Sequence, residues 1–169
     1  MSKVLTHIQQ FILLVGIQII VLNNVQVSGY LNPFVYILFI MILPPKLPKA
    51  FVLILAFATG FTIDVFENSY GVHTAASVFL GYIRPSILSL VSVKGGEDLE
   101  AIGMKQLRFA RFFTYSAILC FTHHFALFFL EAFRMSEFID TIGRTLFSSM
   151  ISLLLILMIE SIRSKTYSK

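Results

Sequence analysis

Residues 112–133 read FFTYSAILCFTHHFALFFLEAF, an apolar run that contains no lysine or arginine. A helix that crosses the hydrocarbon core of a bilayer needs about 20 predominantly apolar residues, and this run is long enough. Its apolar residues do not alternate with polar ones, as they would in a strand of a membrane barrel. Because every backbone group inside a membrane needs a partner within the protein, the run predicts a membrane-spanning α-helix.

The composition of the whole chain agrees with this interpretation. Of the 169 residues, 57% are hydrophobic and 13% are charged, and the mean hydropathy is +0.84. The chain has 18 phenylalanines and no tryptophan, which is more apolar surface than a 19.1 kDa globule can bury in one core. Six spans take up roughly 120 residues and leave no room for a globular domain. A soluble enzyme domain is excluded, and we expect one all-α membrane domain of six transmembrane helices over residues 1–169.

Five further apolar runs accompany the first. Their bounds are Val4–Leu22, Leu31–Leu43, Ala50–Phe66, Val72–Val93 and Ile142–Ile162. No small-residue cleavage site follows Leu22, so we expect the run nearest the amino terminus, Val4–Leu22, to stay as an uncleaved span. The run from Leu31 to Leu43 is the weakest, because it is short for a span and ends at the Pro44–Pro45 pair. Counted from Val27 it is just long enough to cross, so a sixth span and a re-entrant segment both stay open.

The chain turns polar over residues 94–111. Acidic residues come early in this stretch and basic residues come late, which is the order that a helix dipole favours. Apolar residues recur at helical spacing at Leu99, Ile102, Phe109 and Phe113. We therefore expect a cytoplasmic loop with a short interfacial helix that leads into the next span.

The distribution of lysine and arginine predicts the orientation. With six spans and an inner amino terminus, Arg134 and Arg144 alone fall in outer loops, and the other loop and tail cations fall on the inner side. This bias predicts a multi-pass protein of the inner membrane with both termini cytoplasmic. If the second run did not cross, Lys3 alone would change side, so the rule decides the topology only after Lys46. Since the charges lie between apolar runs, we read them as topology signals and expect no nucleic-acid partner.

Ionisable residues inside predicted spans are functional candidates by default, because burying them in a membrane is costly. The candidates are Asp64, His73, Arg84, His123 and His124. His123 and His124 are adjacent and point about 100° apart on a helix, so they cannot chelate one metal ion together. No zincin, nucleophile-elbow or phosphate-loop motif is present, and Cys120 is the only cysteine. We expect a non-enzymatic protein that needs no metal or cofactor.

Small residues recur on two of the predicted spans. Ala56 and Gly60 are four apart on one span, and Ser77 and Gly81 are four apart on the next, so each span offers a face on which backbones can approach closely. We favour packing between these helices over a docking groove for another protein. Pro85 removes the hydrogen bond to the carbonyl of Gly81 and predicts a bend nearby.

Depth within the bilayer predicts which charged groups meet. Residues 68–70 join two spans into a hairpin at the outer face, so Asp64 and His73 both lie roughly 3–5 Å deep. Arg84 lies about 18 Å deep, too far from Asp64 for an ion pair. We expect His73 or the hairpin backbone to satisfy Asp64, and Arg84 to point toward Glu160 or inner lipid phosphates.

Residues 60–85 carry a family resemblance. The motif consists of Gly60, Asp64 and Phe66, then Gly71 and His73, then Tyr82, Arg84 and Pro85. With the chain length and the layout of the spans, it resembles the family of the rod shape-determining protein MreD. The resemblance implies a bacterial inner-membrane protein that binds the single-span protein MreC and works with MreB, RodA and a transpeptidase in sidewall peptidoglycan synthesis. It also implies a fold similar to the substrate-binding subunits of energy-coupling-factor transporters, and no catalytic residues.

Two other functions stay open. A small-molecule-binding subunit of a vitamin-type transporter would need a polar pocket near the outer face. The acidic residues of the outer loops do not by themselves make one; they are Glu67, Glu131, Glu137 and Asp140. An intramembrane protease would need a Ser–His or paired-Asp set, and none occurs at convincing spacing.

Overall fold

The computed structural model describes residues 3–24, 31–92, 99–132 and 138–166, and the described residues form helices and connecting turns without a β-strand. The elements are α1 (Lys3–Ile20), η1 (Leu22–Asn24), α2 (Ile37–Ile42), α3 (Lys49–Glu67), α4 (Val72–Val91), α5 (Met104–Leu107), α6 (Phe109–Ala132) and α7 (Phe138–Thr166). Five helices are long and apolar enough to cross a membrane, namely α1, α3, α4, α6 and α7. The prediction of an all-α membrane protein is confirmed at this level.

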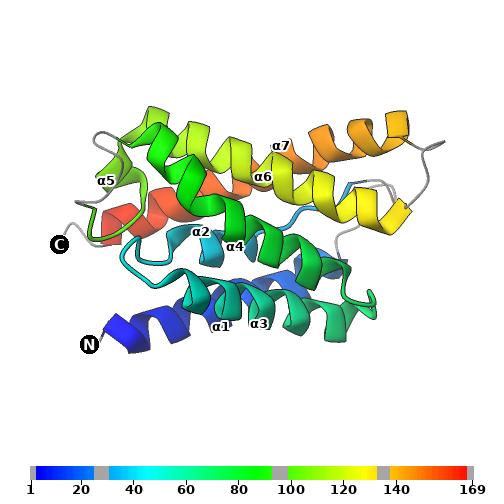
Figure 1. Ribbon diagram of the computed structural model, residues 1–169, viewed down its shortest axis with the longest axis horizontal. Coiled ribbons are helices and arrows are strands. Elements are labelled where there is room, and N and C mark those ends of the chain that lie inside the picture. The colour runs from blue at the N-terminus through cyan, green and yellow to red at the C-terminus, as the bar shows by residue number, and fades with distance from the viewer. Residues whose placement is uncertain (1–2, 25–30, 93–98, 133–137, 167–169) are drawn as a thin grey trace.

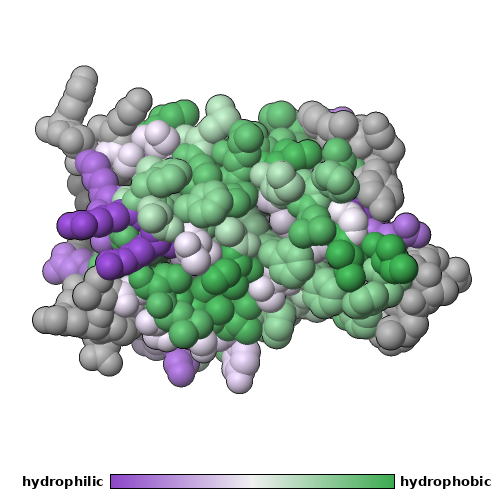
Figure 2. Space-filling model, turned by 90° about the horizontal axis from the view of Figure 1, so that it is seen from above, coloured by the Kyte–Doolittle hydropathy of each residue, from purple (hydrophilic) through white to green (hydrophobic). Residues whose placement is uncertain are grey.

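The five long helices run along the length of the molecule (Figure 1). α1 begins and α7 ends at the same end of the bundle, which we call the termini end; the α3–α4 turn lies at the opposite end, which we call the hairpin end. A hydrophobic surface covers most of the length between them, and the strongest hydrophilic patch lies at the termini end (Figure 2). Large exposed apolar side chains include Ile12 of α1, Phe61 of α3 and Met150 of α7. The bundle therefore presents an apolar belt of the kind that lipid solvates.

The weak second run does not form a sixth long helix. Only Ile37–Ile42 is helical, and the described residues before it have no regular structure. All residues from Pro33 to Leu43 are nevertheless buried, and Phe39 packs edge-on against Phe11 of α1 at 5.3 Å. We call residues 31–43 the central segment. The expectation of a helix throughout the run was wrong, because Pro33 lacks a backbone donor and the neighbouring helices supply other partners for the chain.

Those partners are polar side chains at membrane depth. Gln18 of α1 accepts from the Val35 backbone N–H at 2.8 Å and donates to the Pro33 carbonyl at 3.1 Å, so it bonds to the segment as a neighbouring strand would. Ser152 of α7 accepts from the Phe34 N–H at 2.8 Å, and Ser148 accepts from the Asn32 N–H at 3.2 Å. Non-helical backbone at this depth is tolerated because the protein buries and satisfies it.

The α3–α4 hairpin is closely packed, as the small residues predict. A Cβ atom at Gly60 would lie 2.5 Å from the His73 carbonyl oxygen and 2.6 Å from the Thr74 Cα, so only glycine fits there. A Cβ at Gly81 would lie 3.1 Å from the Ala56 Cβ. Both glycines therefore face the partner helix within the hairpin, which confirms the packing interpretation for these positions.

The stretch over residues 94–111 differs from the expected interfacial helix. Helix α5 has four residues, and Arg108, with φ +64°, separates it from α6. Ile102 is buried in the turn before α5, whereas Phe109 and Phe113 lie on α6 and are exposed. The apolar spacing thus belongs to two elements and not to one helix. Lys94, Glu97 and Asp98 lie outside the described residues, as do Arg134 and Glu137.

Candidate functional site

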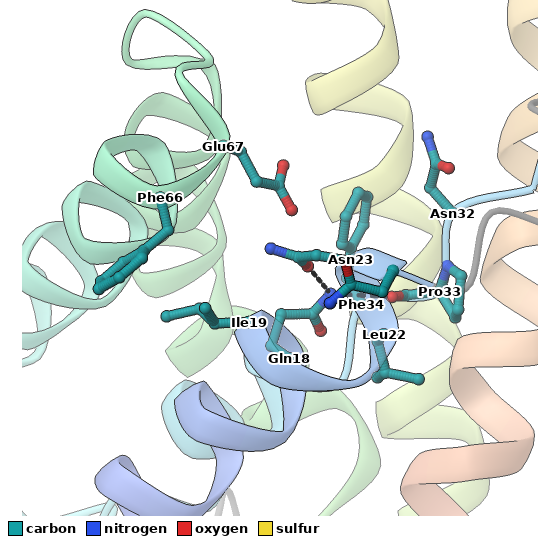
Figure 3. Close-up of a pocket in the computed structure, with 10 residues that line it drawn as sticks. Gln18, Ile19, Leu22, Asn23, Asn32, Pro33, Phe34, Phe66 and Glu67 are labelled. Atoms are coloured by element: carbon teal, nitrogen blue, oxygen red, sulfur yellow. Dashed lines mark hydrogen bonds between the residues drawn. The ribbon is translucent and has the colours of Figure 1, made fainter.

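A polar hollow opens at the hairpin end of the bundle. It consists of two adjoining cavities, one of about 370 Å³ and one of about 580 Å³, which share Asn32, Phe34 and Glu67 as lining residues. Figure 3 shows the first cavity, with Glu67 pointing into it from the end of α3 and the residues around Gln18 and Asn23 forming the opposite wall. We call the two cavities together the hairpin-end hollow.

A chain of hydrogen bonds leads from the hollow into the centre of the bundle. The Glu67 carboxylate lies 2.7 Å from His73 Nε2, and His73 Nδ1 lies 3.0 Å from the Tyr36 hydroxyl. The same hydroxyl lies 2.8 Å from His123 Nε2. His73, Tyr36 and His123 are buried, and Glu67 alone is partly exposed. We call these four residues the relay; they come from α3, α4, the central segment and α6.

The chemistry of the donors fixes the direction of the relay. A carboxylate only accepts, so His73 Nε2 donates to Glu67, and His73 Nδ1 then accepts from the Tyr36 hydroxyl when the ring is neutral. The Tyr36 oxygen in turn accepts from His123 Nε2–H. His123 Nδ1 is left as a bare acceptor, and it is buried with no hydrogen-bond partner. With neutral rings, the opposite direction would bury an unpaired N–H on His123 and turn a lone pair of His73 toward Glu67, so the hydrogen bonds run from His123 through Tyr36 and His73 to Glu67.

Phe34 and His124 hold the relay on its inner side. The Phe34 ring lies edge-on to His73 with a centroid separation of 5.0 Å, and 5.2 Å from the ring of His124. His124 bonds through Nδ1 to the Cys120 carbonyl at 2.8 Å and through Nε2 to Ser152 at 3.0 Å. Both adjacent histidines are thus bonded to protein groups, as their expected structural role requires.

Asp64 is satisfied by the hairpin, as the depth argument predicts. Oδ1 accepts from Ser69 Oγ at 2.6 Å and from the His73 backbone N–H at 3.0 Å. Oδ2 accepts from the backbone N–H of Thr74 at 2.8 Å and from its hydroxyl at 2.5 Å. The imidazole of His73 is not among these partners, because it belongs to the relay. Asp64 therefore closes the turn between α3 and α4.

Arg84 does not reach Glu160, and that prediction was wrong. Its Nε donates to the Met41 carbonyl at 3.3 Å and its Nη2 donates to the Leu43 carbonyl, at the end of α2. Tyr115 of α6 donates to the same Met41 carbonyl at 2.9 Å. The depth estimate left out the central segment, whose carbonyls at the end of α2 accept the hydrogen bonds of Arg84.

Glu160 has other partners at the termini end. Its Oε1 accepts from the Met104 backbone N–H at 3.0 Å, and Arg163 bonds to both of its carboxylate oxygens at 2.5 and 2.8 Å. Arg163 also donates to the Ile102 carbonyl at 3.0 Å. This partly buried cluster joins the turn before α5 to α7.

The predicted site residues therefore fall into two groups. Gly60, Asp64 and His73 meet at the hairpin end. Gly81 packs farther along the hairpin, and Arg84 supports the central segment; Pro85 lies within α4, which continues through it. Tyr36 was not among the predicted site residues, and Glu67 was predicted only as an acid of an outer loop.

Nothing in the comparisons assigns this site. Comparison of the chain with models of protein families, with curated proteins and with solved structures finds no match. Within the described residues, no group of three or more His, Cys, Asp and Glu side chains is arranged to hold a metal ion.

Proposed function

We propose that this protein is a non-enzymatic, multi-pass component of the bacterial cell-elongation machinery that binds MreC in the inner membrane. With MreB, RodA and a transpeptidase, it helps to organise sidewall peptidoglycan synthesis. The observation that carries the proposal is the MreD-like motif over residues 60–85, together with the structural roles that its residues have in this chain. Gly60 and Asp64 form the hairpin, and Arg84 supports the central segment.

The proposal includes six crossings with both termini cytoplasmic. Five crossings are the long helices, and the sixth is the central segment, which is buried from Pro33 to Leu43. Supporting this orientation, most of the described cations lie at helix ends and turns on the termini end, whereas Arg144 lies at the hairpin end and Arg84 is buried within the bundle. The cations of the termini end include Lys46, Lys49, Lys105, Arg108, Arg111 and Arg163. A similarity in fold to the substrate-binding subunits of energy-coupling-factor transporters belongs to the same proposal.

Co-purification tests this function. The chain is co-expressed with the MreC protein of the same genome, extracted in mild detergent and captured by a tag, with an unrelated single-span protein as the control. We expect MreC to be retained in a fixed ratio and the control to be lost. A monodisperse preparation that retains neither protein would contradict the proposal.

A second function, a small-molecule-binding membrane subunit of the vitamin-transporter type, is favoured by the hairpin-end hollow. Its volume lies in the range of small-ligand sites, and it has polar lining residues. Native mass spectrometry of the same preparation tests this function, because a bound metabolite adds a discrete mass to the protein. A spectrum that holds only bare protein and its lipid adducts would count against it.

A further inference from the structure

We propose that the hairpin-end hollow binds a small organic cation, with Glu67 as its counter-ion. This inference rests on the second function above, namely that the hollow takes a small molecule, and it names the class of that molecule. It is compatible with the first function, since a scaffold can carry a ligand site.

The charges around the hollow favour a cation. Arg144 also lines it, but its Nη1 lies 3.0 Å from Glu131, and its guanidinium lies 4.2 Å from the centre of the Phe128 ring. Its positive charge is therefore already compensated. Glu67 differs, because its partner among the described residues is the His73 imidazole, which needs no charge to form the relay. With a neutral imidazole, Glu67 and Glu131 outnumber Arg144 among the lining side chains, so their net charge is negative and an anion would be repelled.

The Glu67 side chain is poised for such a ligand. It is 23% exposed, so water screens it less than a surface carboxylate, and a bound cation would gain more from it. Its bond to His73, which Tyr36 and His123 hold in turn, fixes the carboxylate before any ligand arrives. Preorganisation of this kind lowers the entropy cost of binding.

The walls of the hollow suit an organic cation better than a metal ion. Phe34 and Phe66 line the first cavity, and aromatic faces attract ammonium groups. Asn23 accepts from Gln18 at 2.9 Å through its oxygen, which leaves its amide N–H groups to bind a hydroxyl on the ligand. The second carboxylate of the hollow, Glu131, is paired with Arg144, so Glu67 with its aromatic and amide neighbours lacks the several oxygen ligands that a divalent cation needs.

A matched pair of probes tests the charge requirement. Choline and 3,3-dimethylbutan-1-ol have nearly the same shape, and only choline is charged. Radiolabelled choline is bound to the purified full chain in detergent and displaced by unlabelled choline or by the neutral alcohol. We expect the alcohol to compete at least tenfold more weakly than choline.

Two variants locate the charge. Glu67→Gln keeps an oxygen that accepts from His73, so the relay stays intact, and we expect choline binding to weaken at least tenfold. Glu100→Gln changes the net charge equally on an exposed residue outside the hollow, and it should bind choline as the original chain does. Unchanged thermal unfolding of Glu67→Gln shows that the loss is not a folding defect.

Further experiments distinguish a lipid headgroup from a free metabolite as the source of the cation, and they distinguish failure of this inference from failure of the small-molecule function. In nanodiscs of phosphatidylglycerol, added phosphatidylcholine should displace choline if the site takes a lipid headgroup, and should leave binding unchanged if it takes a free metabolite. Equal binding of choline and the neutral alcohol would overturn the inference but leave the small-molecule function standing. Absence of choline binding would overturn the inference, and native mass spectrometry would still decide the broader function.

Discussion

Three glycine-to-alanine substitutions form a graded test of the α3–α4 packing. A Cβ at Gly16 of α1 would meet nothing within 4 Å, one at Gly81 would touch the Ala56 Cβ at 3.1 Å, and one at Gly60 would lie 2.5 Å from the His73 carbonyl oxygen. All three glycines lie within helices, so each substitution gains about the same helix propensity, on the order of 1 kcal/mol. The differences between the variants therefore report the contact that each new methyl group makes.

The expected magnitudes follow from those contacts. Gly16→Ala should stabilise the protein by up to about 1 kcal/mol, because nothing opposes the gain in propensity. Gly81→Ala should stay within about 1 kcal/mol of the original chain, since the gain and the tight contact offset each other. Gly60→Ala should cost about 3 kcal/mol: overpacking costs roughly 1–3 kcal/mol, and moving α4 away also stretches the hydrogen bonds to the Asp64 carboxylate, worth about 1.5–3 kcal/mol each.

The free energy of unfolding is measured by reversible denaturation with SDS in mixed micelles, followed by circular dichroism. Gly16→Ala serves as the control for a glycine-to-alanine change in a span. The expected order of stability is Gly16→Ala, then Gly81→Ala, then Gly60→Ala. If Gly60→Ala were as stable as Gly81→Ala, the close approach of α3 and α4 would be refuted.

Further outcomes follow from the same contacts. Asp64→Asn turns an acceptor into a donor and should cost about 2 kcal/mol or more in the same assay; equal stability would contradict the carboxylate's role in the hairpin. Arg84→Lys loses the forked contact with two carbonyls and should lower the free energy of unfolding by roughly 1–3 kcal/mol. Its control, Arg111→Lys at the exposed start of α6, should leave the free energy of unfolding unchanged. A similar decrease in both variants would argue against the forked contact. Reporter fusions at Asn24 and after Lys169 should report opposite sides of the membrane, and reports from one side would mean that the central segment does not cross.

Much of the fold follows from the sequence because lipid imposes simple rules. Hydropathy located all five long helices to within a few residues at most ends; the fifth predicted run began at Phe112 and its helix begins at Phe109. The hairpin bonds of Asp64 followed from depth alone, since the turn brings both helix ends to the same level. These properties depend on local sequence and on distance along a helix, which one chain is enough to reveal.

The relay and the central segment could not be predicted in the same way. Tyr36 meets His123 across 87 positions of sequence, and no periodicity encodes that contact. The run that contains Tyr36 is as apolar as a helix, and its irregular backbone depends on Gln18 and Ser152, which belong to other spans. A hydropathy scale assigns each of these two residues an unfavourable free energy of membrane insertion, whereas in the structure they are hydrogen-bond partners of the central segment's backbone.

The polar residues inside the bundle can now be separated by what they bond to. Gln18, Ser152, Arg84 and Tyr115 each satisfy a backbone group of the central segment, so the fold itself requires them. Glu67 bonds to no backbone group among the described residues. Its carboxylate accepts from His73, the neighbouring member of the relay, and lines the hollow. A partly buried carboxylate is costly to keep unless it serves the fold or a ligand, and the described ion-pair partner of Glu67 is the imidazole of His73. Among the described acids, Glu67 therefore fits a binding role best.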